Sequence, residues 1–147
     1  MHSLRSNPIG WQKEMAEIVY LDSPLESEAL YERLCPPVRK WFKDKFPDFT
    51  RPQKLAIPAI MEKQHLLLCS PTGSGKTLTA FLTVIDQLVR LALERKLEKK
   101  VHAIYISPIK ALANDIQRNL IGPLNEIKRG SERTCLFLIP TDSTNLS

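Results

Sequence analysis

Apolar residues in this chain of 147 residues follow two spacings, one typical of helices and one typical of strands. Over most of the chain they recur every three or four positions, which places them on one face of a helix. This spacing predicts helices over residues 11–21, 27–34, 38–46, 51–63, 78–97 and 110–127. We expect the last helix to bend or restart at Gly122-Pro123, because proline cannot complete the helical hydrogen-bond ladder.

Three short apolar runs have the composition of buried strands instead. They cover residues 65–69, 101–107 and 134–139, and the second is rich in β-branched and aromatic side chains. Helix-sized segments between short apolar strands are typical of βαβ units, in which the strands lie parallel. The sequence therefore predicts an α/β fold with parallel strands and flanking helices.

Two helical stripes are the candidate core. The first comprises Val38, Trp41, Phe42 and Phe46, and a ligand-stacking role for one of these aromatics is the alternative interpretation. The second stripe is the inner face of the helix predicted over 78–97. Its members are Phe81, Leu82, Ile85, Leu88, Val89 and Ala92. Both stripes are wide enough for a helix that packs against a protein interior.

Composition narrows the class of protein. With 43% hydrophobic and 25% charged residues, the chain has the make-up of one ordinary globular domain. No apolar run reaches the roughly 20 residues that span a bilayer, and the N-terminus lacks the apolar core of a secretory signal. We expect Cys35, Cys69 and Cys135 to be free structural thiols in a reducing cytoplasm, the last two buried in strands. A net charge of +5 permits a polyanionic partner without establishing one.

The strongest chemical signal is the segment SPTGSGKT, between the first predicted strand and the helix that follows. It meets the phosphate-loop pattern G-x-x-x-x-G-K-[ST], except that Ser70 replaces the first glycine. Gly73 and Gly75 allow the backbone to curl so that N–H groups face phosphate oxygens. Lys76 supplies a charge for the β and γ phosphates, and the Thr77 hydroxyl is a ligand for Mg²⁺. The predicted phosphate-binding residues are Ser70, Pro71, Thr72, Gly73, Ser74, Gly75, Lys76 and Thr77. The expected ligand is ATP.

Two flanking segments bear on the ligand and the partner. Gln53 offers a carboxamide that can pair with adenine N6 and N7, or that only completes a capping box with Thr50. Ser107, Pro108 and Lys110 follow the second predicted strand, where free helix amides and a lysine charge can hold a nucleic-acid phosphate. An ordinary strand-to-helix turn is the alternative for this second segment.

Three segments together resemble the first motor domain of superfamily 2 helicases. They are FTRPQKLAIPAI at 49–60, LLLCSPTGSGKTLTAFL at 66–82 and AIYISPIKALANDIQRNL at 103–120. Their order and spacing agree with the adenine-reading Q motif, motif I and motif Ia of that family. The resemblance is to the Lhr-like (large helicase-related) branch near the DEAD-box proteins, and it covers residues 38–129.

This resemblance implies a P-loop NTPase fold with a helical extension at residues 1–37 and an incomplete first RecA-like domain at 38–147. ATP and Mg²⁺ would be the cofactors. Gln53 would read adenine, and Lys76 and Thr77 would be catalytic. The segment 107–110 would contact one strand of DNA or RNA through Ser107, Pro108 and Lys110. Phe46 and Phe49 are the candidates for the family's adenine-stacking aromatic.

Two parts of the family pattern have no counterpart here. No Asp-Glu pair, the signature of motif II, occurs in the sequence. Nor is there a second motor domain, whose arginine finger is worth roughly 10³–10⁵ in rate. We therefore expect the ATP-binding N-terminal part of an ATP-dependent helicase, truncated before motif II and nearly inert as a catalyst. Its partners would be nucleic acid and the missing C-terminal helicase part. A non-catalytic fragment that binds nucleotide and nucleic acid is the alternative, whereas a P-loop kinase or GTPase lacks supporting motifs.

Other charged residues receive simpler interpretations. Basic residues at the end of the 78–97 helix suit the negative end of the helix dipole, with nucleic-acid contact as the alternative. They are Arg90, Arg95, Lys96, Lys99 and Lys100. His65 has no neighbours in the sequence that would indicate a metal site.

Overall fold

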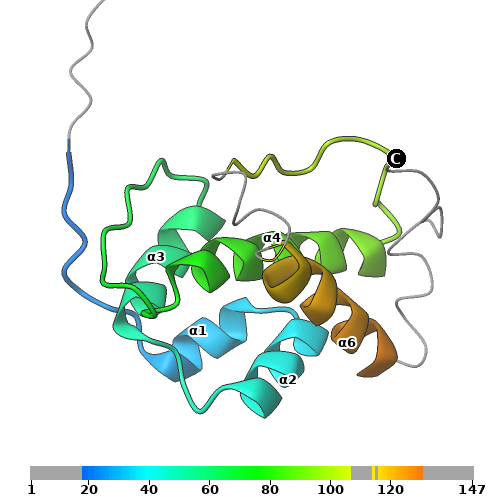
Figure 1. The fold of residues 1–147 in the computed structure, drawn as a ribbon, viewed down its shortest axis with the longest axis horizontal. Coiled ribbons are helices and arrows are strands. Elements are labelled where there is room, and N and C mark those ends of the chain that lie inside the picture. The colour runs from blue at the N-terminus through cyan, green and yellow to red at the C-terminus, as the bar shows by residue number, and fades with distance from the viewer. Residues whose placement is uncertain (1–17, 107–113, 115, 131–147) are drawn as a thin grey trace, which may run out of the picture.

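The computed structural model describes residues 18–106, 114 and 116–130. Every regular element within these ranges is helical (Figure 1). The elements are α1 (Ser27–Arg33), α2 (Pro36–Lys45), α3 (Arg51–Met61), α4 (Lys76–Leu93), the π-helical turn η1 (Gln117–Ile121) and α6 (Gly122–Gly130). In Figure 1, α3 and α4 lie above α1 and α2, and α6 packs against α2. None of the described helices is both long and apolar enough to cross a membrane.

The helices predicted over residues 27–34, 38–46, 51–63 and 78–97 are confirmed, with ends shifted by a few residues. The largest shift is at the end of α4, which stops at Leu93 because Arg95 adopts a left-handed backbone with φ 55°. There the Lys96 N–H donates to Leu91 O at 2.8 Å, which is the hydrogen bond of a Schellman motif. This closure satisfies the last helical carbonyls, and the helix cannot continue to residue 97.

The predictions at the two ends of the chain fare differently. Residues 18–21 are exposed and not helical, so the helix predicted over 11–21 is wrong in this part, and residues 11–17 lie outside the described residues. Helical spacing alone does not stabilise a short helix that has no surface to pack on. Near the other end, η1 leads directly into α6 at Gly122, which confirms a change of helical geometry at Gly122-Pro123.

Proline shapes α3 at its interior. Pro58 lies inside this helix and has no N–H to donate, so the carbonyl of Lys54 is left without its usual helical partner. The N–H of Leu25 donates to that oxygen at 3.2 Å. The segment that precedes α1 is thereby attached to α3.

A single hydrophobic core joins the described helices. The predicted stripe on α2 is confirmed, since Val38, Trp41 and Phe42 are buried and Phe46 packs against them. The predicted inner face of α4 is likewise buried at Phe81, Leu82, Ile85 and Val89. Leu30 and Tyr31 of helix α1 and Leu34 directly after it belong to the same core. The division at residues 37 and 38 stays a prediction, although α2 begins at Pro36 and therefore crosses it.

Polar contacts add to the packing between the helices. The buried carboxylate of Asp86 on α4 accepts the Cys35 N–H at 2.6 Å and pairs with Arg90 at 2.6 Å, and Arg90 also donates to the carbonyl of Arg33. Burial raises the pKa of the Cys35 thiol to about 12, so this cysteine stays protonated and free, as expected. Between α2 and α6, Trp41 donates to Glu126 at 2.7 Å and lowers the pKa of that carboxylate.

The two predicted strands that the structure describes are not confirmed. Residues 65–69 and 101–106 are extended without a β-ladder in the described part of the chain, and several of their apolar side chains face solvent. Leu67 is 87% exposed and Ile106 is 89% exposed, and Cys69 is exposed instead of buried. A strand requires a hydrogen-bonding neighbour along its backbone, and among the described residues neither segment forms a β-ladder with one. Residues 134–139, with Cys135, lie outside the described residues.

Candidate functional site

The predicted phosphate loop connects the extended segment 65–69 to the first turn of α4. Gly73 has φ 79° and Gly75 has φ 87°, both in the left-handed region that favours glycine. Gly75 is the N-cap of α4, and its carbonyl accepts both the N–H and the hydroxyl of Thr79 at 2.9 Å. Lys76 and Thr77 are therefore the first two residues of an 18-residue helix. The positive end of that helix dipole faces the loop.

Gly75 is required for a second reason, which is the close approach of Gln53. A Cβ at position 75 would lie 2.8 Å from Nε2 of Gln53, whereas one at position 73 would meet nothing within 4 Å. Gln53 is only 2% exposed, so it has little freedom to move aside. The sequence pattern places both glycines in the loop, but only the structure distinguishes their roles.

The N-terminus of α3 is joined to the loop through a capping box. Oε1 of Gln53 accepts the Thr50 N–H at 2.9 Å, and the Thr50 hydroxyl accepts in return from the backbone of Gln53. The same Thr50 hydroxyl donates to the carbonyl of Ser74 at 2.9 Å. The capping interpretation of Gln53 is thus confirmed, and its role toward adenine stays a prediction. The contact from Thr50 to the loop was missed, and the T-x-x-Q spacing gave no signal for it.

Lys76 is turned toward its own loop. Its ammonium donates to the carbonyls of Ser70 and Pro71, the latter at 2.7 Å. The Ser74 hydroxyl forms two hydrogen bonds within the loop, one with Ser70 Oγ at 2.6 Å and one to Pro71 O at 2.8 Å. The loop residues therefore lie close together, as predicted, and much of their hydrogen bonding is internal.

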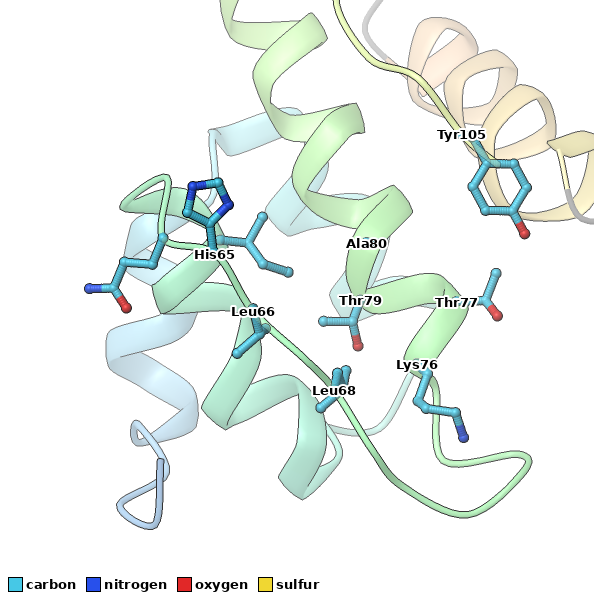
Figure 2. A pocket seen from close by; sticks show the side chains of 10 residues that line it. His65, Leu66, Leu68, Lys76, Thr77, Thr79, Ala80 and Tyr105 are labelled. Carbon is cyan, nitrogen blue, oxygen red and sulfur yellow. The ribbon is translucent and has the colours of Figure 1, made fainter. Parts of the chain in front are cut away.

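A pocket of about 500 Å³ lies beside the loop (Figure 2). Lys76 and Thr77 line it from the first turn of α4, and Leu66 and Leu68 line it from the extended segment. Tyr105 closes another side and packs on Phe81 with ring centroids 4.8 Å apart. Most of the lining is apolar, and its polar side chains include Lys76 and Thr77 beside the loop and His65 away from it.

The residues of the loop suit a triphosphate with Mg²⁺. The first N–H groups of α4 have no partner within the helix, and they point out of its N-terminus. Lys76 offers an ammonium, and Thr77 is exposed, so its hydroxyl is accessible to a cation. Hard oxygen ligands of this kind are what Mg²⁺ prefers. The donor set therefore agrees with the predicted ligands.

One of the other predicted positions is corrected. Phe49 is 4% exposed and stacks on Phe42 with centroids 4.2 Å apart, so it belongs to the core and is not placed to stack on adenine. Phe46 also packs on Phe42, with ring centroids 4.8 Å apart, but it is half-buried, and its role toward adenine stays a prediction. His65 lines the pocket, and the described residues contain no group of three metal-ligating side chains. Ser107, Pro108 and Lys110 lie outside the described residues.

Three of the five basic residues at and after the end of α4 pair with neighbouring acids. Arg90 pairs with Asp86, Lys96 lies 2.8 Å from Glu94, and Lys100 lies 2.9 Å from Glu98. These local pairs agree with the interpretation of a solvated helix end.

With the loop, the capping box and the helix in place, similarity to known proteins decides the family. Residues 50–143 match the family of DEAD/DEAH box helicases. The chain belongs to this family. The ATP-dependent helicase Lhr-Core of Methanocaldococcus jannaschii is 50% identical over 113 residues, which are 77% of this chain and 13% of that protein.

Two further relatives support an Lhr-like helicase. The ATP-dependent helicase Lhr-Core of Saccharolobus solfataricus is 54% identical over 102 residues, which are 69% of this chain and 12% of that protein. The Lhr helicase/uracil glycosylase of Escherichia coli is 43% identical over 112 residues, which are 72% of this chain and 7% of that protein. The resemblance read from the motifs is therefore confirmed. No solved structure matches the chain.

Membership in the DEAD/DEAH box helicases implies a P-loop NTPase fold of the RecA-like kind. The chain spans about an eighth of the length of the Lhr-Core proteins that it matches.

Proposed function

We propose that these residues form the ATP-binding region of an ATP-dependent DNA or RNA helicase, and that the loop from Ser70 to Thr77 binds the phosphates. The observation that carries this proposal is the junction between loop and helix. Gly73 and Gly75 both have a left-handed backbone, and α4 begins directly after Gly75 with Lys76 and Thr77. Backbone N–H groups, an ammonium and the helix dipole then converge on one anion.

The chain's own residues would divide the work on the nucleotide. Lys76 would turn from the neutral carbonyls of its loop to the β and γ phosphates, where donor and acceptor are both charged and the hydrogen bonds are stronger. Thr77 would hold the Mg²⁺ that neutralises the phosphate charge. Gln53 would read adenine with the unused lone pair of Oε1 and with Nε2. Because Gln53 is 2% exposed, this reading requires the loop at Gly75 to move away from it.

We further propose that residues 65–69, 101–107 and 134–139 are the parallel strands of the family's sheet. Their exposed apolar side chains, such as Leu67 and Ile104, support this, since a sheet covered on both faces buries such residues. The neighbours would be other strands of the complete domain. Ser107, Pro108 and Lys110, at the end of the second strand, would contact one nucleic-acid strand.

Binding and hydrolysis are expected to separate in this chain. Its 147 residues contain no Asp-Glu pair, the element that in the family positions the attacking water. The chain by itself should therefore bind ATP and release no phosphate. Calorimetric titration with Mg²⁺ and ATP tests the first expectation, and a phosphate-release assay tests the second.

The variant Lys76→Ala tests the assignment of the loop. Removing a charge-assisted contact to phosphate should weaken ATP binding by roughly 10- to 100-fold. Lys40→Ala is the matched control, since Lys40 lies on α2 in an exposed pair with Asp44. Equal ATP affinity of the Lys76→Ala variant and the unaltered chain would contradict the proposal.

A further inference from the structure

The hydroxyl groups of Ser70 and Ser74 form a directed chain across the phosphate loop. Ser74 Oγ donates its hydrogen to Pro71 O at 2.8 Å. A hydroxyl has one hydrogen, so the 2.6 Å contact between Ser70 and Ser74 must be a donation by Ser70. Hydrogen bonds in such a chain polarise and strengthen one another. The first and fifth residues of the loop are thus tied together.

Lys76 is held by the same part of the loop. Its ammonium donates to Ser70 O and Pro71 O, so the Pro71 carbonyl accepts from both Ser74 and Lys76. Thr50 fixes Ser74 from outside by donating to its carbonyl at 2.9 Å. The arrangement turns the ammonium of Lys76 toward backbone carbonyls of the loop. These carbonyls compete with a phosphate for the hydrogens of the Lys76 ammonium.

We propose that Ser70 and Ser74 form a clasp that keeps the phosphate loop closed on Lys76 and that must open before a triphosphate binds. The inference rests on the proposed function, because it concerns regulation of the same loop. The standard pattern has glycine at the position of Ser70, and glycine offers no hydroxyl. The clasp is therefore a property of the side chains present in this sequence.

The clasp lowers the affinity for nucleotide without preventing binding. Phosphate oxygens form charge-assisted hydrogen bonds with Lys76 that are stronger than those of neutral carbonyls, so a triphosphate displaces the closed form. Part of the population remains in the closed form. The apparent affinity for the triphosphate is therefore the intrinsic affinity multiplied by the fraction of molecules in the open form. Loss of one neutral hydrogen bond should raise affinity by roughly 2- to 10-fold.

The experiment compares Ser70→Ala, Ser74→Ala and the double variant in the full 147-residue chain. Calorimetric titrations use ATP with Mg²⁺ and, separately, inorganic tripolyphosphate, which reports on the loop alone. Ser70→Ala should tighten binding of both ligands by the same factor. Ser74→Ala should tighten it at least as much, because it also removes the bond to Pro71, and the double variant should equal Ser74→Ala. Ser23→Ala is the control, since Ser23 is exposed and bonds to Asp22.

The outcomes separate the clasp from the proposed function. If the unaltered chain binds ATP and both single variants bind it equally or more weakly, the clasp is overturned and ATP binding stands. A gain with ATP that is absent with tripolyphosphate also overturns it, since the effect would then lie outside the phosphate loop. If neither the unaltered chain nor any variant binds either ligand, the proposed function fails and the clasp fails with it.

Discussion

Leu82 on α4 and Leu67 in the segment before the phosphate loop have identical side chains but opposite surroundings. Leu82 is fully buried in the core that the helices share, whereas Leu67 is 87% exposed. The contrast extends to the regions around them. The described helices leave none of their large apolar residues exposed, while the extended segments 65–69 and 101–106 leave most of theirs facing solvent.

The difference shows how far each kind of element depends on distant parts of a chain. A helix satisfies its backbone hydrogen bonds within one segment, so it needs neighbours only for its apolar face. A strand needs a partner for its backbone as well, and without one it is merely extended. The segments 65–69 and 101–106 have the composition of strands, but they form no ladder within the part of the chain that the structure describes.

The largest expected effect comes from truncating the same side chain in both regions. Leu82→Ala should lower the free energy of unfolding by about 2–5 kcal/mol, because it removes buried methyl groups and leaves a cavity. Leu67→Ala should change it by less than about 0.5 kcal/mol, because the side chain is already in water. Urea denaturation of the 147-residue chain measures both. A large loss for Leu67→Ala would mean that this segment is buried in a sheet even in the chain as it stands.

The second effect lies where the extended segment meets the helix. Gly75→Ala should cost about 2 kcal/mol or more, since it combines a left-handed backbone with a clash against Gln53. Gly73→Ala has the backbone cost alone, about 1 kcal/mol. Only Gly75→Ala should be partly rescued when Gln53 is also replaced by alanine. Equal losses for the two glycine variants, measured by urea denaturation, would show that the contact with Gln53 is unimportant.

The smallest expected effect is a loss of stability at low pH, and it arises in the helical region. Hydrogen bonds from Ser27, Lys54 and the Phe49 N–H hold the pKa of Asp48 at about 2, below its usual 3.8. Because the folded pKa is lowered, Asp48 stabilises the fold above about pH 4, and this contribution is lost as the pH falls toward 2. After screening by solvent, it should be about 0.5–1 kcal/mol.

Asp48→Asn checks this contribution. The variant should be less stable than the unaltered chain at pH 5, and most of this difference should be gone at pH 2, as measured by urea denaturation at each pH. The extended segments 65–69 and 101–106 contain no carboxylate, so they should not contribute to this pH dependence. A constant difference in stability across the range would show that the amide disrupts packing and that the charge of Asp48 is not the cause.

Most helices and the ligand class could be predicted from sequence because their signals are local. The apolar stripe of α2, the capping box at Thr50 and the order of Gly75, Lys76 and Thr77 each lie within a few residues. Local patterns failed where burial depends on distant partners. Cys69 was expected in a buried strand and is exposed, and Phe49 was a candidate for adenine stacking and packs in the core.

The sequence by itself therefore determined where helices form, which residues make the phosphate loop and which family the chain resembles. Only the tertiary structure decided how these parts meet. It placed Gln53 against Gly75, turned Lys76 onto its own loop and joined Ser70 to Ser74. The physical reason is range: helix formation and loop motifs depend on neighbouring residues, whereas these contacts depend on how α3, α4 and the loop pack together.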